Sequence, residues 1–133
     1  MSNHPVEDKA SLSGIRREIR AELTRVGADP ALSFDCLVAV TEACSNALMH
    51  GLESEDDQSP EVSWEIDSDV ARFFVQDHSD QRWARAAHPS RSPAGLDDRV
   101  GGFGLKMMRK LMDEVDIRQS PSGTTVVLVK RLG

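Results

Sequence analysis

The chain has 133 residues, of which 39% are hydrophobic and 29% charged, which suits one domain around a single core. Its formal net charge of −6 excludes a dedicated nucleic-acid binder, because such proteins need a basic surface. No apolar run approaches the roughly 20 residues of a membrane span, and the N-terminus lacks the pattern of a secretion signal. These features predict a cytoplasmic protein with neither a membrane nor a nucleic-acid partner.

The two cysteines, Cys36 and Cys44, fall eight residues apart on one predicted helix. This separation along a helix axis is too long for a disulfide, so we expect two reduced thiols in the core. The spacing of cysteines and histidines matches no metal-binding pattern.

The N-terminal part of the chain begins with a polar stretch, residues 1–10, which we expect to be disordered and without a strand. From Ser11 to Val26, apolar residues recur every three or four positions, which predicts an amphipathic helix. The opposite face of that helix is charged and is expected to be solvated. Residues 27–30 end it with a glycine and a proline.

A second, more apolar helix is predicted to begin at Phe34, with Ser33 as its N-cap and Gly51 just past its end. Glu42, Asn46 and His50 are spaced four residues apart on it, so they project from one side. Polar groups on a buried helix are costly unless something satisfies them. Three in register therefore favour the wall of a ligand pocket over a solvated stripe.

Two strands are predicted after this helix, at residues 62–66 and 70–75, with a short turn between them and Asp77 at the end of the second. Two more are predicted at residues 113–119 and 124–131. With a third helix between the two pairs, the order predicts an α+β two-layer sandwich with a mainly antiparallel sheet. We expect residues 1–133 to form one domain.

A long irregular stretch, residues 78–100, is predicted to be a lid over a binding site. Glycines follow it at positions 101, 102 and 104, directly before helix-forming residues 105–112. A glycine-rich turn at a helix N-terminus favours phosphate, although it is weak alone and matches neither a P-loop nor a dinucleotide fingerprint.

The polar residues fit the needs of a nucleotide. Asn46 suits a Mg²⁺ ion whose other ligands are phosphates and waters. Glu42 can accept a proton from an attacking hydroxyl. Asp77 can accept a hydrogen bond from an exocyclic amine such as that of adenine.

These motifs resemble those of the GHKL ATPases, the superfamily of gyrase, Hsp90 and histidine kinases. The run Glu42-x-x-x-Asn46-x-x-x-His50-Gly51 resembles their N-box. Asp77 resembles the aspartate of their first glycine box, and residues 100–105 resemble the second.

Within the superfamily, the chain is most similar to the anti-sigma serine kinases of the RsbW and SpoIIAB type. This similarity rests on residues 41–47, 111–115 and 123–130, and it covers nearly the whole chain from about residue 11.

The resemblance implies a Bergerat-type ATP-binding fold with ATP and Mg²⁺ as ligands. Glu42 would be the general base, Asn46 the Mg²⁺ ligand and Asp77 the contact to the adenine amine. His50 is grouped with the nucleotide-binding residues, as a helix cap or a support for the pocket.

The same resemblance implies further contacts. Thr124 or Thr125 would support the adenine end, and Arg16 would contact a protein partner. The triphosphate would be lined, beneath the lid, by Gly101, Gly102, Phe103, Gly104 and Leu105.

The function that the resemblance implies is phosphorylation of a serine on a STAS-domain anti-anti-sigma factor, alternating with sequestration of a sigma factor. A homodimer is implied as well. The alternative is a nucleotide-binding module that sequesters a regulator without kinase activity. It is favoured by residues 77–81, which read Asp-His-Ser-Asp-Gln where the family has Asp-x-Gly-x-Gly. A histidine kinase is disfavoured, because no dimerisation helices with a phospho-acceptor histidine precede the domain.

Overall fold

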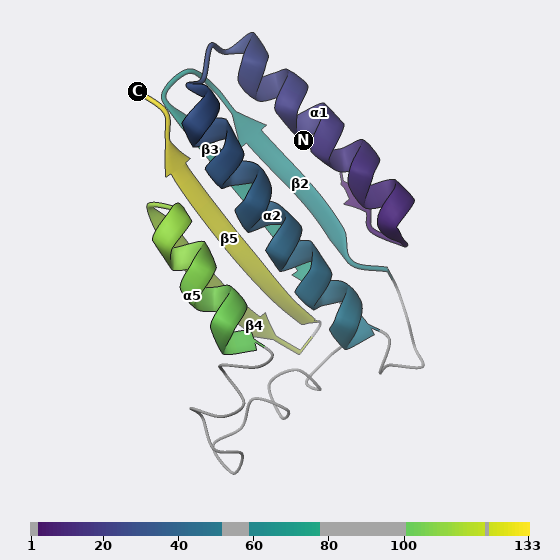
Figure 1. The fold of residues 1–133 in the computed structure, drawn as a ribbon. Helices are drawn as coiled ribbons and strands as arrows, with labels where there is room; N and C mark the ends of the chain where they lie inside the picture. Colours follow the sequence, from purple (N-terminus) through teal and green to yellow (C-terminus); the bar gives the residue numbers. More distant parts are fainter. Residues whose placement is uncertain (1–2, 52–58, 78–100, 122) are drawn as a thin grey trace.

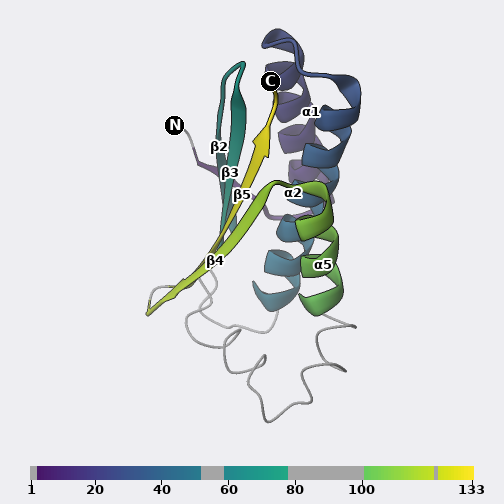
Figure 2. The same ribbon diagram turned by 90° about the vertical axis from the view of Figure 1, so that its left-hand side faces the viewer.

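The structure, a computed structural model, describes residues 3–51, 59–77, 101–121 and 123–133. Within these residues, helices lie on one face of a five-stranded antiparallel sheet (Figure 1). The view along the sheet edge shows the two layers (Figure 2). The predicted α+β two-layer sandwich is confirmed. The elements are β1 (His4–Pro5), α1 (Lys9–Arg25), α2 (Pro30–Gly51), β2 (Glu61–Ile66), β3 (Val70–Asp77), α5 (Gly101–Leu111), β4 (Glu114–Ser120) and β5 (Gly123–Arg131).

The sheet has the strand order β1-β2-β3-β5-β4, with β3 at its centre. Phe73 of β3 lies opposite Trp64 of β2 and Leu128 of β5. Side chains alternate between the two faces of a strand. Accordingly, Phe73 and its i±2 neighbours are buried beneath the helices, whereas Arg72 is exposed on the other face. Buried alternate positions of the central strand therefore fix which face carries the helices.

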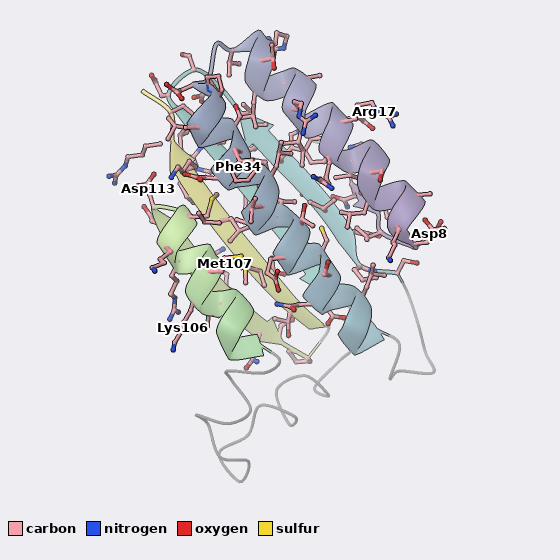
Figure 3. All side chains as sticks on the ribbon, in the orientation of Figure 1. Asp8, Arg17, Phe34, Lys106, Met107 and Asp113 are labelled. Atoms are coloured by element: carbon pink, nitrogen blue, oxygen red, sulfur yellow. The ribbon has the colours of Figure 1, made fainter. Side chains whose placement is uncertain are left out.

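Helix α1 begins slightly before its predicted start, because Asp8 caps it. The backbone N–H of Ser11 donates to Asp8 Oδ1 at 2.9 Å, and the Asp8 N–H donates to Ser11 Oγ at 3.1 Å. The predicted amphipathic pattern is confirmed, with Arg17 pointing away from the sheet (Figure 3). The buried side of the helix consists of Leu12, Ile15, Ile19 and Leu23.

Helix α2 begins at Pro30, so the predicted start at Phe34 and the predicted cap at Ser33 are both wrong. Asp29 is the residue that caps the helix, because its Oδ1 accepts from the Ala31 N–H at 2.8 Å. Proline suits the first helical position, where its missing N–H costs nothing. Gly51 closes the last turn of the helix instead of following it.

We expected no apolar run of membrane-spanning length, and this expectation is wrong, because one helix has the required length and hydropathy. Residues 30–48 of α2 reach a mean hydropathy of 1.2 over a membrane-spanning length. The helix packs in the core, however, which accounts for its apolar character. Its buried side chains are Cys36, Leu37, Ala39, Val40, Ala43, Cys44 and Ala47.

The N-terminal segment forms a strand, contrary to the expectation that residues 1–10 are disordered and strandless. In β1, His4 lies opposite Val62, and Val6, directly after the strand, is fully buried. The Val6 N–H donates to the Pro60 carbonyl at 2.7 Å. The His4 ring stacks on Trp64 with centroids 4.5 Å apart. Pairing and stacking thus hold a polar sequence that has no strand pattern of its own.

Both cysteines are free and buried, which confirms the predicted reduced core thiols. Burial raises the pKa of each thiol to about 12. At neutral pH both are therefore protonated and poorly nucleophilic.

Candidate functional site

Four element ends meet at one end of the molecule, as Figure 1 shows. They are the C-terminal ends of α2 and β3 and the N-terminal ends of α5 and β5. The antiparallel pairing of β3 with β5 brings Asp77 directly opposite Thr124. We refer to this region as the site end.

Glu42 and Asn46 occupy the flank of α2 that faces α5. Asp35 identifies that flank, because it contacts Lys130, which also contacts the last residue of α5. Positions seven and eleven residues after Asp35 are close to two and three full helical turns away. Glu42 and Asn46 therefore lie on the same side as Asp35, about two and three turns nearer the site end, and both are half-buried.

Asp77 and Thr124 are both buried, each with 6% of its surface exposed. They lie on the helix-covered face of the sheet, because Asp77 shares the buried side of β3 with Phe73 and Val75. Thr125 lies opposite Gln76 and hence on the uncovered face. Of the two threonines that the sequence offered for the adenine end, the structure brings only Thr124 to the site.

Helix α5 begins at Gly101, so the predicted glycine turn before a helix at Leu105 is wrong as secondary structure. The glycines instead form the first turn, in spite of their low helix propensity. The first N–H groups of a helix lack intrahelical partners, so this position is compatible with phosphate binding, which stays a prediction. Leu105 is half-buried and packs against the core.

Several predicted site residues are only partly described. His50 lies in the last turn of α2, but its side chain is outside the described residues, as are those of residues 101–104. The whole predicted lid, residues 78–100, is also outside them.

The oxygen-bearing side chains suit a magnesium–nucleotide complex better than a metal held by protein alone. In the part of the chain that the structure describes, no three His, Cys, Asp or Glu side chains gather as a metal site. A divalent ion bound beside Asn46 would therefore take most of its ligands from phosphates and water, as Mg²⁺ commonly does. A Mg²⁺ site at Asn46 stays a prediction.

The far end of the helix layer is held by contacts that the sequence did not predict. Lys130 Nζ donates to the Leu111 carbonyl at the end of α5 and lies 3.3 Å from Asp35 Oδ2. Asp113, just past α5 (Figure 3), accepts the Arg131 N–H at 2.6 Å. A signal was available, since Lys130 occupies a helix-facing position of β5 after Val126 and Leu128. We call Asp35, Leu111, Asp113 and Lys130 the anchor.

Arg16 lies on the exposed side of α1. It is therefore accessible to another protein, and its partner contact stays a prediction.

The fold and these positions define an ATPase domain of a known class. Residues 6–130 match the family model of the histidine kinase-like ATPase domain. The match spans nearly the whole chain, and the protein belongs to this family.

Named relatives narrow the class. The chain is 32% identical over 125 residues to the serine-protein kinase RsbW of Bacillus velezensis, covering 86% of this chain and 76% of the relative. It is 30% identical to the RsbW of Bacillus subtilis, covering 89% and 76%. The RsbW of Staphylococcus aureus is 27% identical, covering 90% and 78%. The chain thus belongs with the RsbW relatives.

A solved structure agrees on the fold. The RsbU and RsbW domains of Rv1364c from Mycobacterium tuberculosis match with a TM-score of 0.70 at 22% identity. The match covers 98% of this chain and 31% of that chain. It supports the sandwich fold alone.

Proposed function

We propose that the protein is an ATP-dependent serine-protein kinase and anti-sigma factor, acting in the cytoplasm within a partner switch. Its protein substrate would be a serine of a STAS-domain anti-anti-sigma factor, and its other partner a sigma factor. The observation that carries this proposal is the placement of Glu42 and Asn46 on the α5-facing flank of α2. That flank leads to the buried pair of Asp77 and Thr124. The RsbW relatives are named serine-protein kinases, which supports a protein serine as the phosphate acceptor.

ATP would bind with its adenine amine at Asp77 and Thr124 and its phosphates at the first turn of α5. A buried carboxylate at a strand end orients the base, because it accepts from the amine. The N–H groups at the helix N-terminus face the phosphates. Mg²⁺, held by Asn46 and the phosphates, would neutralise their charge.

Glu42 would act as the general base. It would accept the proton of the substrate serine as the hydroxyl oxygen bonds to the γ-phosphorus. The bond between that phosphorus and the β–γ bridging oxygen breaks, which yields ADP and phosphoserine. Such catalysis consists mainly of positioning and charge stabilisation.

The product of this reaction would also drive the switch. Phosphorylation adds about 1.5 to 2 negative charges at pH 7 to the STAS partner. Carrying a net charge of −6, the kinase would release a partner whose negative charge has increased. It would then be free to hold a sigma factor, with Arg16 on α1 as one contact.

The test is transfer of labelled phosphate from ATP to a cognate STAS protein. Wild type should transfer, and Glu42→Ala should lose transfer by about 100-fold or more while still binding ATP. Thr41→Ala is a matched control, because Thr41 Oγ1 donates to the Leu37 carbonyl of the same helix at 2.7 Å.

The second candidate, sequestration without phosphorylation, is favoured by the altered sequence at residues 77–81. Binding of the STAS protein or a sigma factor without any transfer by wild type would establish it and refute the kinase proposal.

A further inference from the structure

Phe34, near the start of α2, is an apolar side chain on the surface of the molecule (Figure 3). It is 65% exposed, and among the described residues it is the only exposed large hydrophobic side chain. The helical repeat turns Leu37, Val40 and Cys44 toward the core, and Phe34 falls outside that face. A single exposed phenyl ring is ordinary, but this one also borders a hollow.

The hollow measures about 380 Å³ and lies between the end of α1 and the start of α2. Leu37, which is buried, and Ala28, which packs against the core, also line it. Its floor is therefore apolar. A hollow with an apolar floor beside an exposed aromatic ring has the form of a pocket for a partner's side chain. We call it the α1–α2 hollow.

The charged rim of the α1–α2 hollow is positive. Arg20 lines it, no carboxylate is among its described lining residues, and Arg16 lies one turn earlier on the same side of α1. Within the part of the chain that the structure describes, neither arginine forms an ion pair, whereas Arg25 pairs with Glu22 at 2.8 Å. Arg20 therefore offers an unpaired guanidinium beside an apolar pocket, on a protein whose net charge is −6.

These features define the side chains that a partner must present. A third helix laid along the groove between α1 and α2 would place one large apolar side chain in the hollow. An aspartate or glutamate three or four positions away on that helix would then face Arg20, because such positions share a side. Aromatic and arginine side chains often carry most of the binding energy of an interface. The fitting partner is thus an amphipathic helix with an acidic residue one turn from its apolar anchor.

The α1–α2 hollow lies away from the site end. It is at the corner where α1 leads into α2, and Figure 1 shows this corner at the opposite end of the molecule. The hollow also opens on the α1 side of α2, whereas Glu42 and Asn46 occupy the flank that faces α5. Phe34 precedes Glu42 by eight residues, which is about 12 Å along the helix axis. A partner bound in the hollow therefore leaves the site end accessible to a substrate serine.

We propose that the α1–α2 hollow holds a helix of the regulator that the protein sequesters, which is the sigma factor of the proposed function. The partner's identity rests on that function, and the mode of binding rests on the hollow. Its positive rim favours the sigma factor over the STAS protein. Phosphorylation makes the STAS protein more negative, so a positive rim would retain this partner instead of releasing it.

The first test is the affinity of the full chain for its cognate sigma factor, measured by isothermal titration calorimetry with ATP and Mg²⁺ present. Phe34→Ala should raise the dissociation constant by about tenfold or more, because it removes the ring that encloses the partner's side chain. Phe34→Leu keeps an apolar rim and should bind more tightly than Phe34→Ala. Since the ring is exposed, the urea unfolding midpoint should change little in either variant.

The second test concerns the rim and the room inside the hollow. Arg20→Glu should raise the dissociation constant by about tenfold, and this loss should shrink at high salt because the charges are screened. Lys110→Glu, on the exposed face of α5, makes the same change in net charge and should bind like wild type. Thr24→Trp, from an exposed position on α1 that lines the hollow, should fill it and block binding.

Phosphate transfer to the STAS protein, measured on the same variants, should stay at the wild-type rate, since Phe34 and Arg20 lie outside the site end. Any of three results would overturn the proposal. In the first, Phe34→Ala binds the sigma factor as tightly as wild type. In the second, the STAS protein loses affinity and the sigma factor does not. In the third, wild type self-associates and Phe34→Ala abolishes the association, so that a second copy fills the hollow.

Failure of the proposed function gives different results. A wild type that binds the sigma factor through the hollow but transfers no phosphate would refute the kinase activity alone. A wild type that binds no sigma factor would refute the anti-sigma function, and the proposed docking surface with it. Normal sigma binding by every hollow variant would refute the docking surface alone.

Discussion

The two ends of α2 are built for different purposes. At its start, Asp29 caps the helix and Asp35 meets Lys130 of the anchor, so polar groups there have partners within the fold. Toward its end, Glu42 and Asn46 are half-buried on the same flank, where α5 begins with glycines. At one end of the helix the polar groups have partners within the fold, and at the other end we propose that they meet a ligand. Substitutions at the two ends should therefore separate stability from activity.

The largest effect is expected at the site end, from Asn46→Ala. Phosphate transfer should fall by about 100-fold or more, because the charge stabilisation that a metal supplies is worth several kcal/mol. Stability should change little. Transfer rates and Mg²⁺-dependent nucleotide binding measure the loss, with Ser45→Ala, half-buried on another side of the helix, as control. Equal losses in the two variants would contradict the assignment of Asn46.

A smaller effect, on stability, is expected at the anchored end from Lys130→Met. The change keeps the apolar stem but removes the donor to Leu111 and Asp35, and 12% of the lysine side chain is exposed. The free energy of unfolding should fall by about 2 kcal/mol. Urea unfolding measures it, and Lys110→Met on the exposed face of α5 serves as control. An unchanged midpoint would mean that the anchor contributes nothing.

A last effect is absent at neutral pH and concerns Cys44, which is fully buried. Burial raises its pKa from 9.0 to about 12 in the folded chain, so the thiol favours folding below pH 9. That contribution should decline between pH 9 and 12, by up to about 1.4 kcal/mol per pH unit, because the unfolded chain ionises first. The difference in the free energy of unfolding between wild type and Cys44→Ala, measured across this pH range, isolates the contribution of the thiol. If the free energies of unfolding of the two proteins changed in parallel with pH, the predicted contribution of Cys44 would be contradicted.

The sequence predicted what local periodicity encodes and missed what depends on distant residues. The alternation of apolar residues in β2, the strand-forming residues of β3 and the helical repeat of α1 were sufficient for the two layers and for the order of the elements after β1. The start of α2 was misplaced because Asp29 and Pro30 were taken for a turn, whereas they are a cap and a first helical residue. The two-residue β1 has no pattern to detect, since only its pairing with β2 makes it a strand.

The site was predictable to a similar degree. The spacing of Glu42 and Asn46 indicated a shared side, and the end of β3 at Asp77 was confirmed. The choice of Thr124 over Thr125 required the register of β3 with β5. The alternation in β5 could have placed Lys130 on the helix-facing side, but its partner Asp35 could not be predicted, because the two residues are 95 positions apart in the chain.

The stack of His4 on Trp64 gives the protein a built-in optical probe. The chain has two tryptophans, and the other, Trp83, falls in the segment predicted as the lid. In a Trp83→Phe variant, indole emission would come only from the ring that holds β1 to β2. Detachment of the N-terminal strand could then be followed separately from unfolding of the whole sheet, and Trp64→Phe would leave Trp83 as the single indole reporter.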